Sequence, residues 1–209
     1  MNLMLRTGLC VGLLAVPQSV LGADYTMDAT SSELYVQVFK DPDTLGAGLS
    51  HDHVIQAAGW NGSISWDSAD PSSCAIVVSV PVNRLVVDEP SLRQRVGYDT
   101  TLSDSQREDV RGKMIGDGQL DGATYPLITF RSTSCNSDSI TGDLSIHGVA
   151  KSVTMAATIA ADDANFSASG QLSIRASQFG FQPFSALMGQ LKNRDDMLLH
   201  IKLVGTTGG

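Results

Sequence analysis

The feature that most constrains this chain is a series of short apolar runs with a two-residue period. Every second residue of the segment 34–39 is Leu or Val, and the segment 74–82 is rich in β-branched residues. Successive side chains of a β-strand point to opposite faces, so this period predicts strands that are buried on one side. Gly, Pro and Asp separate the runs and predict tight turns between them.

The runs are spaced like the strands of hairpins. Expected strands cover 34–39, 74–82, 127–132, 139–147, 152–160, 166–174 and 197–204, with two short strands or one bent strand within 51–67. Between Asp88 and Gly116 the pattern becomes polar and compatible with helix, with Ser or Asp available as caps. There is no βαβ alternation and no repeat of fixed period. The sequence therefore predicts one all-β domain, an antiparallel barrel or sandwich of about eight strands with a helical insertion.

Composition narrows the range of partners. The chain has 22 acidic residues against 14 basic ones, a formal net charge of -8 and no Lys/Arg cluster. Such a surface does not attract a phosphate backbone, which excludes nucleic acid as an expected partner.

The N-terminus has the order of regions found in secretory signal peptides. Arg6 precedes an apolar run at 9–16, and Pro17 and small residues follow up to Ala23. A membrane anchor is the alternative, but the apolar run is too short to cross ~30 Å of hydrocarbon. We expect residues 1–23 to be a cleaved signal peptide, residues 24–209 to be the mature domain, and the periplasm to be its compartment.

Two cysteines, Cys74 and Cys135, remain after such cleavage. In an oxidising compartment this pair predicts a disulfide, and two free buried thiols are the alternative. No CxxC spacing occurs, so neither thiol redox chemistry nor a cysteine-based zinc site is supported.

The string His51-Asp52-His53 places two imidazoles on the same face of an expected strand. Two clustered nitrogens underfill a zinc or copper site, and His147 and His200 have no spacing that ties them to the pair. We expect His51 and His53 to be polar residues at the rim of a cavity that hydrogen-bond a ligand headgroup. The rival hypothesis is a metal-linked or redox-linked protein, or an enzyme, organised on His51 and His53 with Asp52 or His147 nearby.

A loop at 175–184 contains three of the six phenylalanines of the chain. Aromatic side chains offer a large contact area, so this loop could close the mouth of an apolar cavity. A plug that only fills the core is the structural alternative. No Gly-x-Ser-x-Gly elbow is present, and we expect no catalytic residue.

Three segments together resemble the YceI-like lipid- or polyisoprenoid-binding family: Tyr125-Pro126-Leu127-Ile128-Thr129-Phe130-Arg131-Ser132, Gly142 to Val153 and Ile174 to Gly180. The resemblance implies an extended, lipocalin-like, eight-stranded barrel that holds an isoprenoid or another lipid in its lumen. It implies a non-catalytic carrier with no cofactor apart from a bound quinone-like lipid and no metal. Candidate partners of such a carrier are an inner-membrane redox or lipid-handling protein and a second copy of the chain.

Strand alternation then selects candidate ligand-binding residues within such a barrel. The candidate lining is Val36, Val38, Ile64, Val78, Phe130, Ile146 and Phe179, with His51, His53, His147, Arg175 and Phe184 as further candidate contacts.

Overall fold

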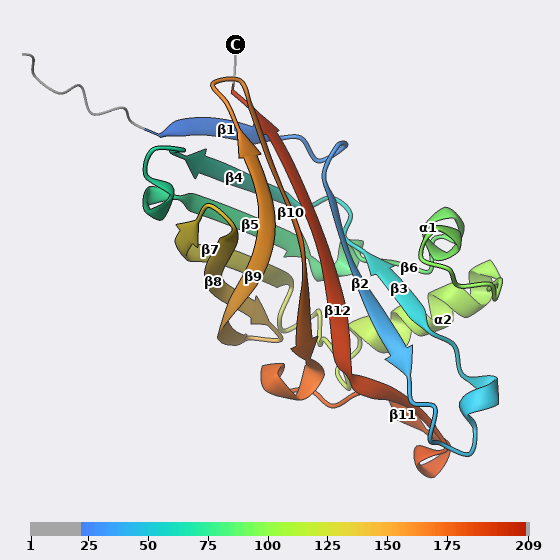
Figure 1. Ribbon diagram of the computed structural model, residues 1–209. Coiled ribbons are helices and arrows are strands. Elements are labelled where there is room, and N and C mark those ends of the chain that lie inside the picture. Colours follow the sequence, from blue (N-terminus) through green and yellow to red (C-terminus); the bar gives the residue numbers. More distant parts are fainter. Residues whose placement is uncertain (1–21, 208–209) are drawn as a thin grey trace, which may run out of the picture.

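The computed structural model describes residues 22–207, and most of them lie in β-strands (Figure 1). Residues 1–21 of the predicted signal peptide lie outside the described residues. The strands are β1 (Ala23–Met27), β2 (Glu33–Lys40), β3 (His53–Gln56), β4 (Asn61–Trp66), β5 (Ala75–Pro81), β6 (Val86–Val87), β7 (Leu127–Asn136), β8 (Ser139–Ile146), β9 (Val149–Ala161), β10 (Asn165–Arg175), β11 (Ser185–Ala186) and β12 (Leu191–Thr206).

All pairings between the strands are antiparallel, and they close a ring. The order is β1-β4-β5-β7-β8-β9-β10-β12, and β12 pairs back with β1 through Thr26 opposite Thr206. The structure is thus the closed eight-stranded barrel that the sequence predicts. Closure satisfies the backbone groups that an open sheet would leave unpaired at its edges.

Three of the barrel walls are broken into two strands each. The last residues of β12 pair with β1, whereas its earlier residues pair with β2, so β1 and β2 follow one another along the same neighbour. β4 pairs with β5, and β3 pairs with β6. A second wall therefore consists of β3 and β4, and a third consists of β5 and β6.

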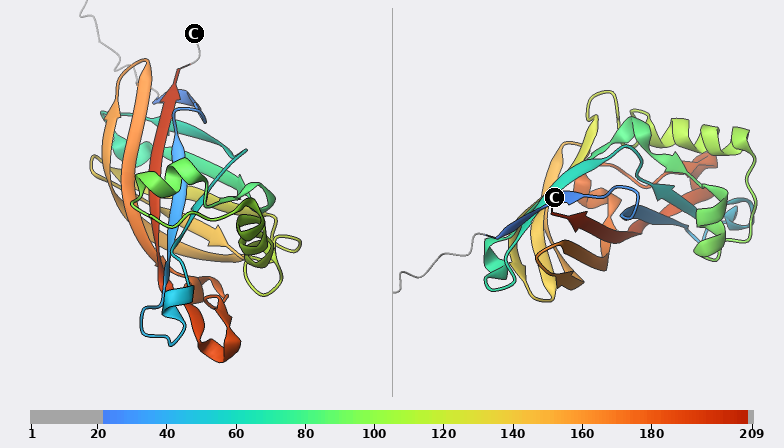
Figure 2. Two further views of the ribbon diagram at one scale, coloured as in Figure 1. Left: turned by 90° about the vertical axis from the view of Figure 1, so that its right-hand side faces the viewer. Right: turned by 90° about the horizontal axis from the view of Figure 1, so that it is seen from above.

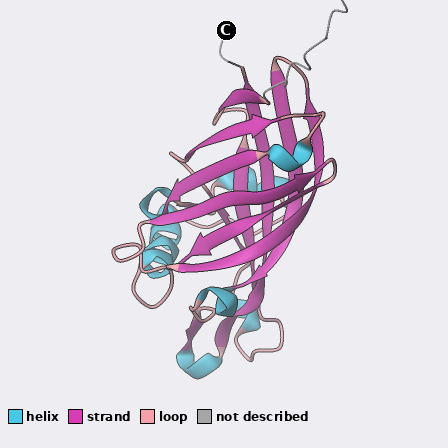
Figure 3. Cartoon of the chain, turned by 90° about the vertical axis from the view of Figure 1, so that its left-hand side faces the viewer, coloured by secondary structure: helices cyan, strands magenta, loops and turns pink. Residues whose placement is uncertain are grey.

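The predicted helical insertion is present as two helices, α1 (Pro90–Arg95) and α2 (Asp104–Ile115). Ser103 caps α2 by accepting a hydrogen bond from the backbone N–H of Gln106, whose side chain in turn accepts from the N–H of Ser103. α1 lies beside β3 and α2 beside β6, at one side of the barrel (Figures 1 and 3). None of the helices between residues 22 and 207 is long and apolar enough to cross a membrane.

One end of the barrel is filled by aromatic side chains. The ring centroid of Phe166 lies 5.6 Å from those of both Tyr25 and Trp66, and Ile64 is buried with them. The Tyr25 hydroxyl donates a hydrogen bond of 2.6 Å to the carbonyl of Asp162 in the β9–β10 turn. This packing closes the end of the barrel near the C-terminus.

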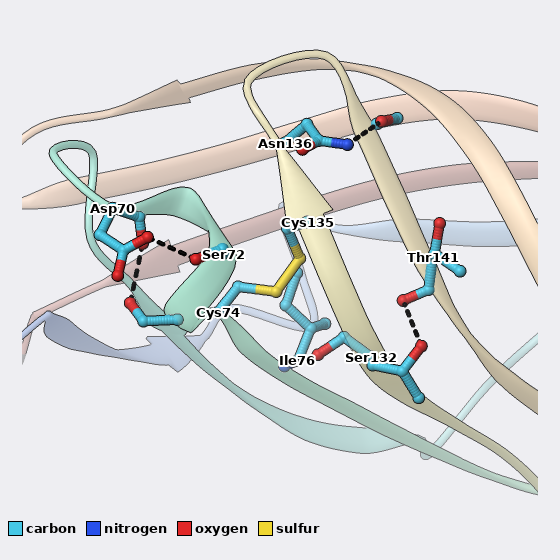
Figure 4. The surroundings of a disulfide bond; sticks show 11 residues. Asp70, Ser72, Cys74, Ile76, Ser132, Cys135, Asn136 and Thr141 are labelled. Carbon is cyan, nitrogen blue, oxygen red and sulfur yellow. Dashed lines mark hydrogen bonds between the residues drawn. A yellow bond between two sulfur atoms is a disulfide. The ribbon is translucent and has the colours of Figure 1, made fainter.

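The predicted disulfide between Cys74 and Cys135 is present (Figure 4). It joins the residue before β5 to β7 and spans 61 positions of the sequence. Next to it, the backbone N–H of Ile76 donates a 2.8 Å hydrogen bond to the Ser132 hydroxyl. The disulfide therefore links two strands, β5 and β7, that are already neighbours in the sheet.

Candidate ligand-binding site

The barrel encloses an apolar cavity of about 330 Å³. Its volume lies within the range of small-molecule sites, roughly 300–1,000 Å³. Most of its wall consists of inward-facing strand residues: Leu34, Val36, Val38, Ile55, Ile76, Val78, Val80, Ile128, Phe130, Ile140, Leu144, Ile146, Val153, Met155, Leu172, Ile174, Met197, Leu199, Ile201 and Leu203.

Strand pairing places these side chains side by side. Val36 of β2 lies opposite Leu199 of β12 on one side and opposite Ile55 of β3 on the other. Directly paired residues of neighbouring strands share a face of the sheet. The two-residue period of the sequence therefore becomes a continuous apolar wall.

The open end of the cavity is bounded by α2 and by the segment that follows the 3-10 helix Ala176–Phe179. Lys113 of α2 places its ammonium 5.6 Å from the ring centroid of Phe184. Gln119 donates a 3.0 Å hydrogen bond to the carbonyl of Gln182, which ties the end of the α2 segment to this loop. Lys113 and Gln119 thus add polar side chains to the wall where α2 and the loop meet the barrel. The other polar residues of the wall lie on strands: Tyr35, His53, Thr129, Asn193 and Arg194.

His53 is held by a buried carboxylate. Its Nδ1 lies 2.6 Å from Oδ2 of Asp88, a residue that is fully buried. Asp88 also accepts hydrogen bonds from the backbone N–H of Val54 at 3.0 Å and from the Arg93 guanidinium at 2.6 Å. Burial raises the pKa of Asp88, but these hydrogen bonds and the charge of His53 outweigh it, so the pKa lies below its ordinary value.

Arg93 is buried as well and completes the network. Its guanidinium donates to the carbonyls of Asp52 at 2.8 Å and Thr100 at 3.0 Å in addition to Asp88. A buried cation with this many acceptors fixes the position of the carboxylate between it and His53. The His53 ring is therefore oriented by the fold before any ligand arrives.

The contact with Asp88 determines what His53 can offer to a ligand. A carboxylate only accepts hydrogen bonds, so Nδ1 of His53 carries a proton, and Nε2 is an acceptor in the neutral ring and a donor in the imidazolium. Within residues 22–207 no side chain or backbone group hydrogen-bonds to Nε2. Because His53 lies on the cavity wall, this nitrogen is a candidate acceptor for a ligand hydroxyl.

His51 lies differently from the sequence-based expectation. β3 begins at His53, so His51 precedes the strand, and the prediction that one strand directs both rings the same way is wrong. Asp52, between the two histidines, accepts a 2.8 Å hydrogen bond from the backbone N–H of Lys40. Burial, and then the positive charges of His53, Arg93 and Lys40, lower the pKa of His51. His51 is not part of the cavity wall.

Seven of the candidate residues lie on the cavity wall, and a ligand-binding role for them stays a prediction. These are Val36, Val38, His53, Val78, Phe130, Ile146 and Phe184. The alternation of the strands selected the correct face at each strand position in this group.

Four other candidates lie elsewhere. Ile64 packs in the closed end of the barrel, one level beyond the cavity. Phe179 is fully buried and is a core plug, the structural alternative for the aromatic loop. His147 occupies the β8–β9 turn, with its ring edge-on to that of Tyr125 at 4.6 Å, and Arg175 is exposed at the end of β10.

The sequence-based analysis missed Asp88, Arg93 and Lys113. Asp88 is 35 residues from His53, and nothing in the local sequence links them. One available signal was the pair Asp88-Glu89 before Pro90, because Glu89 caps α1 and leaves Asp88 free for another role. In the described part of the chain, no group of three or more His, Cys, Asp and Glu side chains is placed to hold a metal ion.

Comparisons with known proteins agree with this architecture. The profile of the YceI-like domain matches residues 25–204. A UPF0312 protein of Pseudomonas fluorescens is 27% identical over 139 residues, which cover 66% of this chain and 63% of that protein. The match therefore spans less than two thirds of the length of this curated relative.

Solved structures share the fold at low sequence identity. Burkholderia cenocepacia BcnA superposes with a TM-score of 0.61 at 18% identity, over 85% of this chain and 98% of that chain. A polyisoprenoid binding domain from Saccharophagus degradans gives 0.55 at 14% identity, over 90% and 99%. The YCEI protein of Campylobacter jejuni gives 0.54 at 17% identity, over 74% and 85%.

Proposed function

This chain belongs to the YceI-like family, and we propose that it is a periplasmic carrier that holds the tail of an isoprenoid or similar lipid in its barrel lumen. The observation that carries the proposal is the cavity itself, whose wall is predominantly apolar. Each buried CH₂ group contributes about 0.8 kcal/mol, so affinity should rise with chain length until the tail fills the lumen. The Saccharophagus degradans relative, named as a polyisoprenoid binding domain, supports the same ligand class.

Two further observations support the proposed compartment. The N-terminal sequence has the pattern of a cleaved signal peptide. The Cys74–Cys135 disulfide suits a protein that folds in an oxidising environment. Both support export to the periplasm.

The mouth favours a ligand with a hydrogen-bond donor on its headgroup. In the neutral ring, Nδ1 of His53 donates to Asp88 and Nε2 is an acceptor. A hydroxyl can donate to it, whereas the carbonyl of an oxidised quinone cannot. A quinol-like or alcohol-bearing lipid is therefore the proposed ligand, with Lys113 and Arg194 as further donors to its oxygens.

A matched pair of variants on β10 tests the location of the ligand. Leu172 lines the cavity, whereas Ser173 is exposed on the outer face. Geranylgeraniol, an isoprenoid alcohol, serves as the probe in isothermal titration calorimetry. We expect Leu172→Trp to weaken binding by at least about tenfold through loss of lumen space, and Ser173→Trp to leave it unchanged. Equal affinities for the two variants would place the ligand outside the lumen.

A change in the probe tests the headgroup contact separately. The methyl ether of geranylgeraniol keeps the tail but loses the hydroxyl proton. We expect the wild-type protein to prefer the alcohol and His53→Phe to bind both probes equally. If the wild-type protein bound both probes with equal affinity, the proposed contact with His53 would be wrong. The proposal that the lumen holds the tail would still stand.

A further inference from the structure

Two loops at the open end of the barrel expose large apolar side chains. Leu45 and Leu49, in the loop 41–50, are 94% and 75% exposed. Leu187 and Met188, at the tip of the β11–β12 hairpin, are 61% and 99% exposed. Among residues 22–207 only two other large hydrophobic side chains are classed as exposed. We call these four residues the apolar tip.

The two loops are fixed to each other by backbone hydrogen bonds. The N–H of Gly46 donates to the carbonyl of Gln190 at 2.9 Å, and the N–H of Asp41 donates to that of Lys192 at 2.8 Å. A Cβ atom at position 46 would lie 2.6 Å from the Gln190 oxygen, so this close approach requires glycine. Figure 2 shows the two loops projecting together from the barrel. The apolar tip is thus a single preformed surface.

The backbone conformation at the tip of the β11–β12 hairpin is unfavourable for Leu187 and Met188. Leu187 and Met188 have φ angles of 51° and 52°, in the left-handed region, and Gly189 follows at 87°. Asn or Gly adopts this conformation at lower cost than Leu or Met. The turn would therefore form more easily with polar residues, and strain of this kind concentrates at functional positions.

The hairpin leads directly from the cavity to the apolar tip. At its base the N–H of Asn193 donates a 2.9 Å hydrogen bond to the carbonyl of Phe184, and both residues line the cavity wall. Leu187 is only three residues beyond Phe184. Whatever covers the apolar tip therefore also lies next to the mouth of the cavity.

Area and charge indicate what that partner is. A stable protein interface takes about 800 Å² from each partner, more than four side chains on two narrow loops supply. The loops 41–50 and 185–191 contain Asp41 and Asp43, and two lysines adjoin them: Lys40, whose ammonium donates to the carbonyl of Ala47, and Lys192. The tip therefore has no net positive charge to attract anionic lipid headgroups, and apolar insertion is the main source of affinity.

We propose that the apolar tip inserts into the interfacial layer of a lipid bilayer and places the mouth of the cavity at the membrane surface. The proposal rests on the proposed function, because a lipid ligand would enter from the membrane. Projecting Leu and Met side chains suit a fluid acyl boundary, which adapts to them without a matching rigid surface.

Flotation with phosphatidylcholine vesicles tests this proposal. We expect the wild-type protein to float with the vesicles, and the double variant Leu187→Asn/Met188→Asn to lose at least about tenfold in partitioning. The same variant should keep or raise its melting temperature, because Asn suits the left-handed backbone. Leu127→Asn, which changes an exposed leucine of β7 outside both loops, is the matched control and should float like the wild type.

Lipid composition and salt distinguish apolar insertion from electrostatic binding. Adding phosphatidylglycerol should leave binding equal or weaker, and high salt should not release the protein. Binding that requires phosphatidylglycerol, a wild type that fails to float, or a double variant that floats normally would each overturn the proposal. Geranylgeraniol binding by the same variant in vesicle-free solution is expected to be normal. That assay distinguishes a loss of membrane binding at the apolar tip from a loss of lipid binding in the lumen.

Discussion

Reduction of the Cys74–Cys135 disulfide should lower the free energy of unfolding by about 4 kcal/mol. The bond closes a loop of 61 residues, and the chain-entropy relation for a loop of this length gives this value at 25 °C. The folded state should persist after reduction, because β5 and β7 remain paired from Val77 opposite Arg131 to Pro81 opposite Leu127. The loss therefore arises mainly from the greater freedom of the unfolded chain.

The assay is guanidinium unfolding of the same protein with and without a phosphine reductant, followed by far-ultraviolet circular dichroism. In thermal unfolding the expected fall in melting temperature is about 8–16 °C for a domain of this size. The double variant Cys74→Ala/Cys135→Ala should be insensitive to the reductant and serves as the control. A loss below about 1 kcal/mol would refute the loop-entropy reasoning. Two titratable thiols in the denatured, unreduced protein would refute the disulfide itself.

Three further predictions concern the stability of the fold. Asp88→Ala should cost about 3–5 kcal/mol in denaturant unfolding, because it leaves the buried Arg93 cation unpaired, and a loss below about 1 kcal/mol would show that water replaces the carboxylate. Burial lowers the pKa of His200, so the unfolded state binds more protons below about pH 6.5 and stability should fall as the pH falls through this range. His200→Gln should flatten that pH profile, and an unchanged slope would assign it to other groups. Gly148→Ala should lower the melting temperature, because Gly148 has a φ of +73° and a Cβ atom would lie 2.4 Å from the Tyr125 ring; an unchanged melting temperature would contradict this.

Strand alternation predicted the antiparallel β-fold because it reports burial at each position, and the resemblance to the YceI-like family selected the barrel over the sandwich. Val36, Val78 and Phe130 face the lumen as their alternation indicates. Alternation identifies a face and not a height along the barrel. Ile64 therefore has an inward-facing side chain but lies in the closed end, where Trp66 and Phe166 leave no space for a ligand.

The mouth was harder to predict because its residues meet only through tertiary structure. The ring of His53 is oriented by Asp88. His53 begins β3 and Asp88 lies just before α1, so the two residues meet only in the folded chain. Residues 192–196, near the start of β12, are charged and polar and lack the apolar alternation of the rest of the strand. Their pairing with β11 builds the hairpin, which local sequence patterns do not reveal.

The central claim is that the lumen holds an isoprenoid lipid in the cell. The most direct measurement is organic extraction and mass spectrometry of the protein purified from its native host without detergent, with Leu172→Trp purified in parallel. The account predicts close to one hydroxyl-bearing polyprenyl lipid per wild-type chain and a strongly reduced amount in the variant. A lipid-free wild-type protein, or equal lipid content in both proteins, would contradict it.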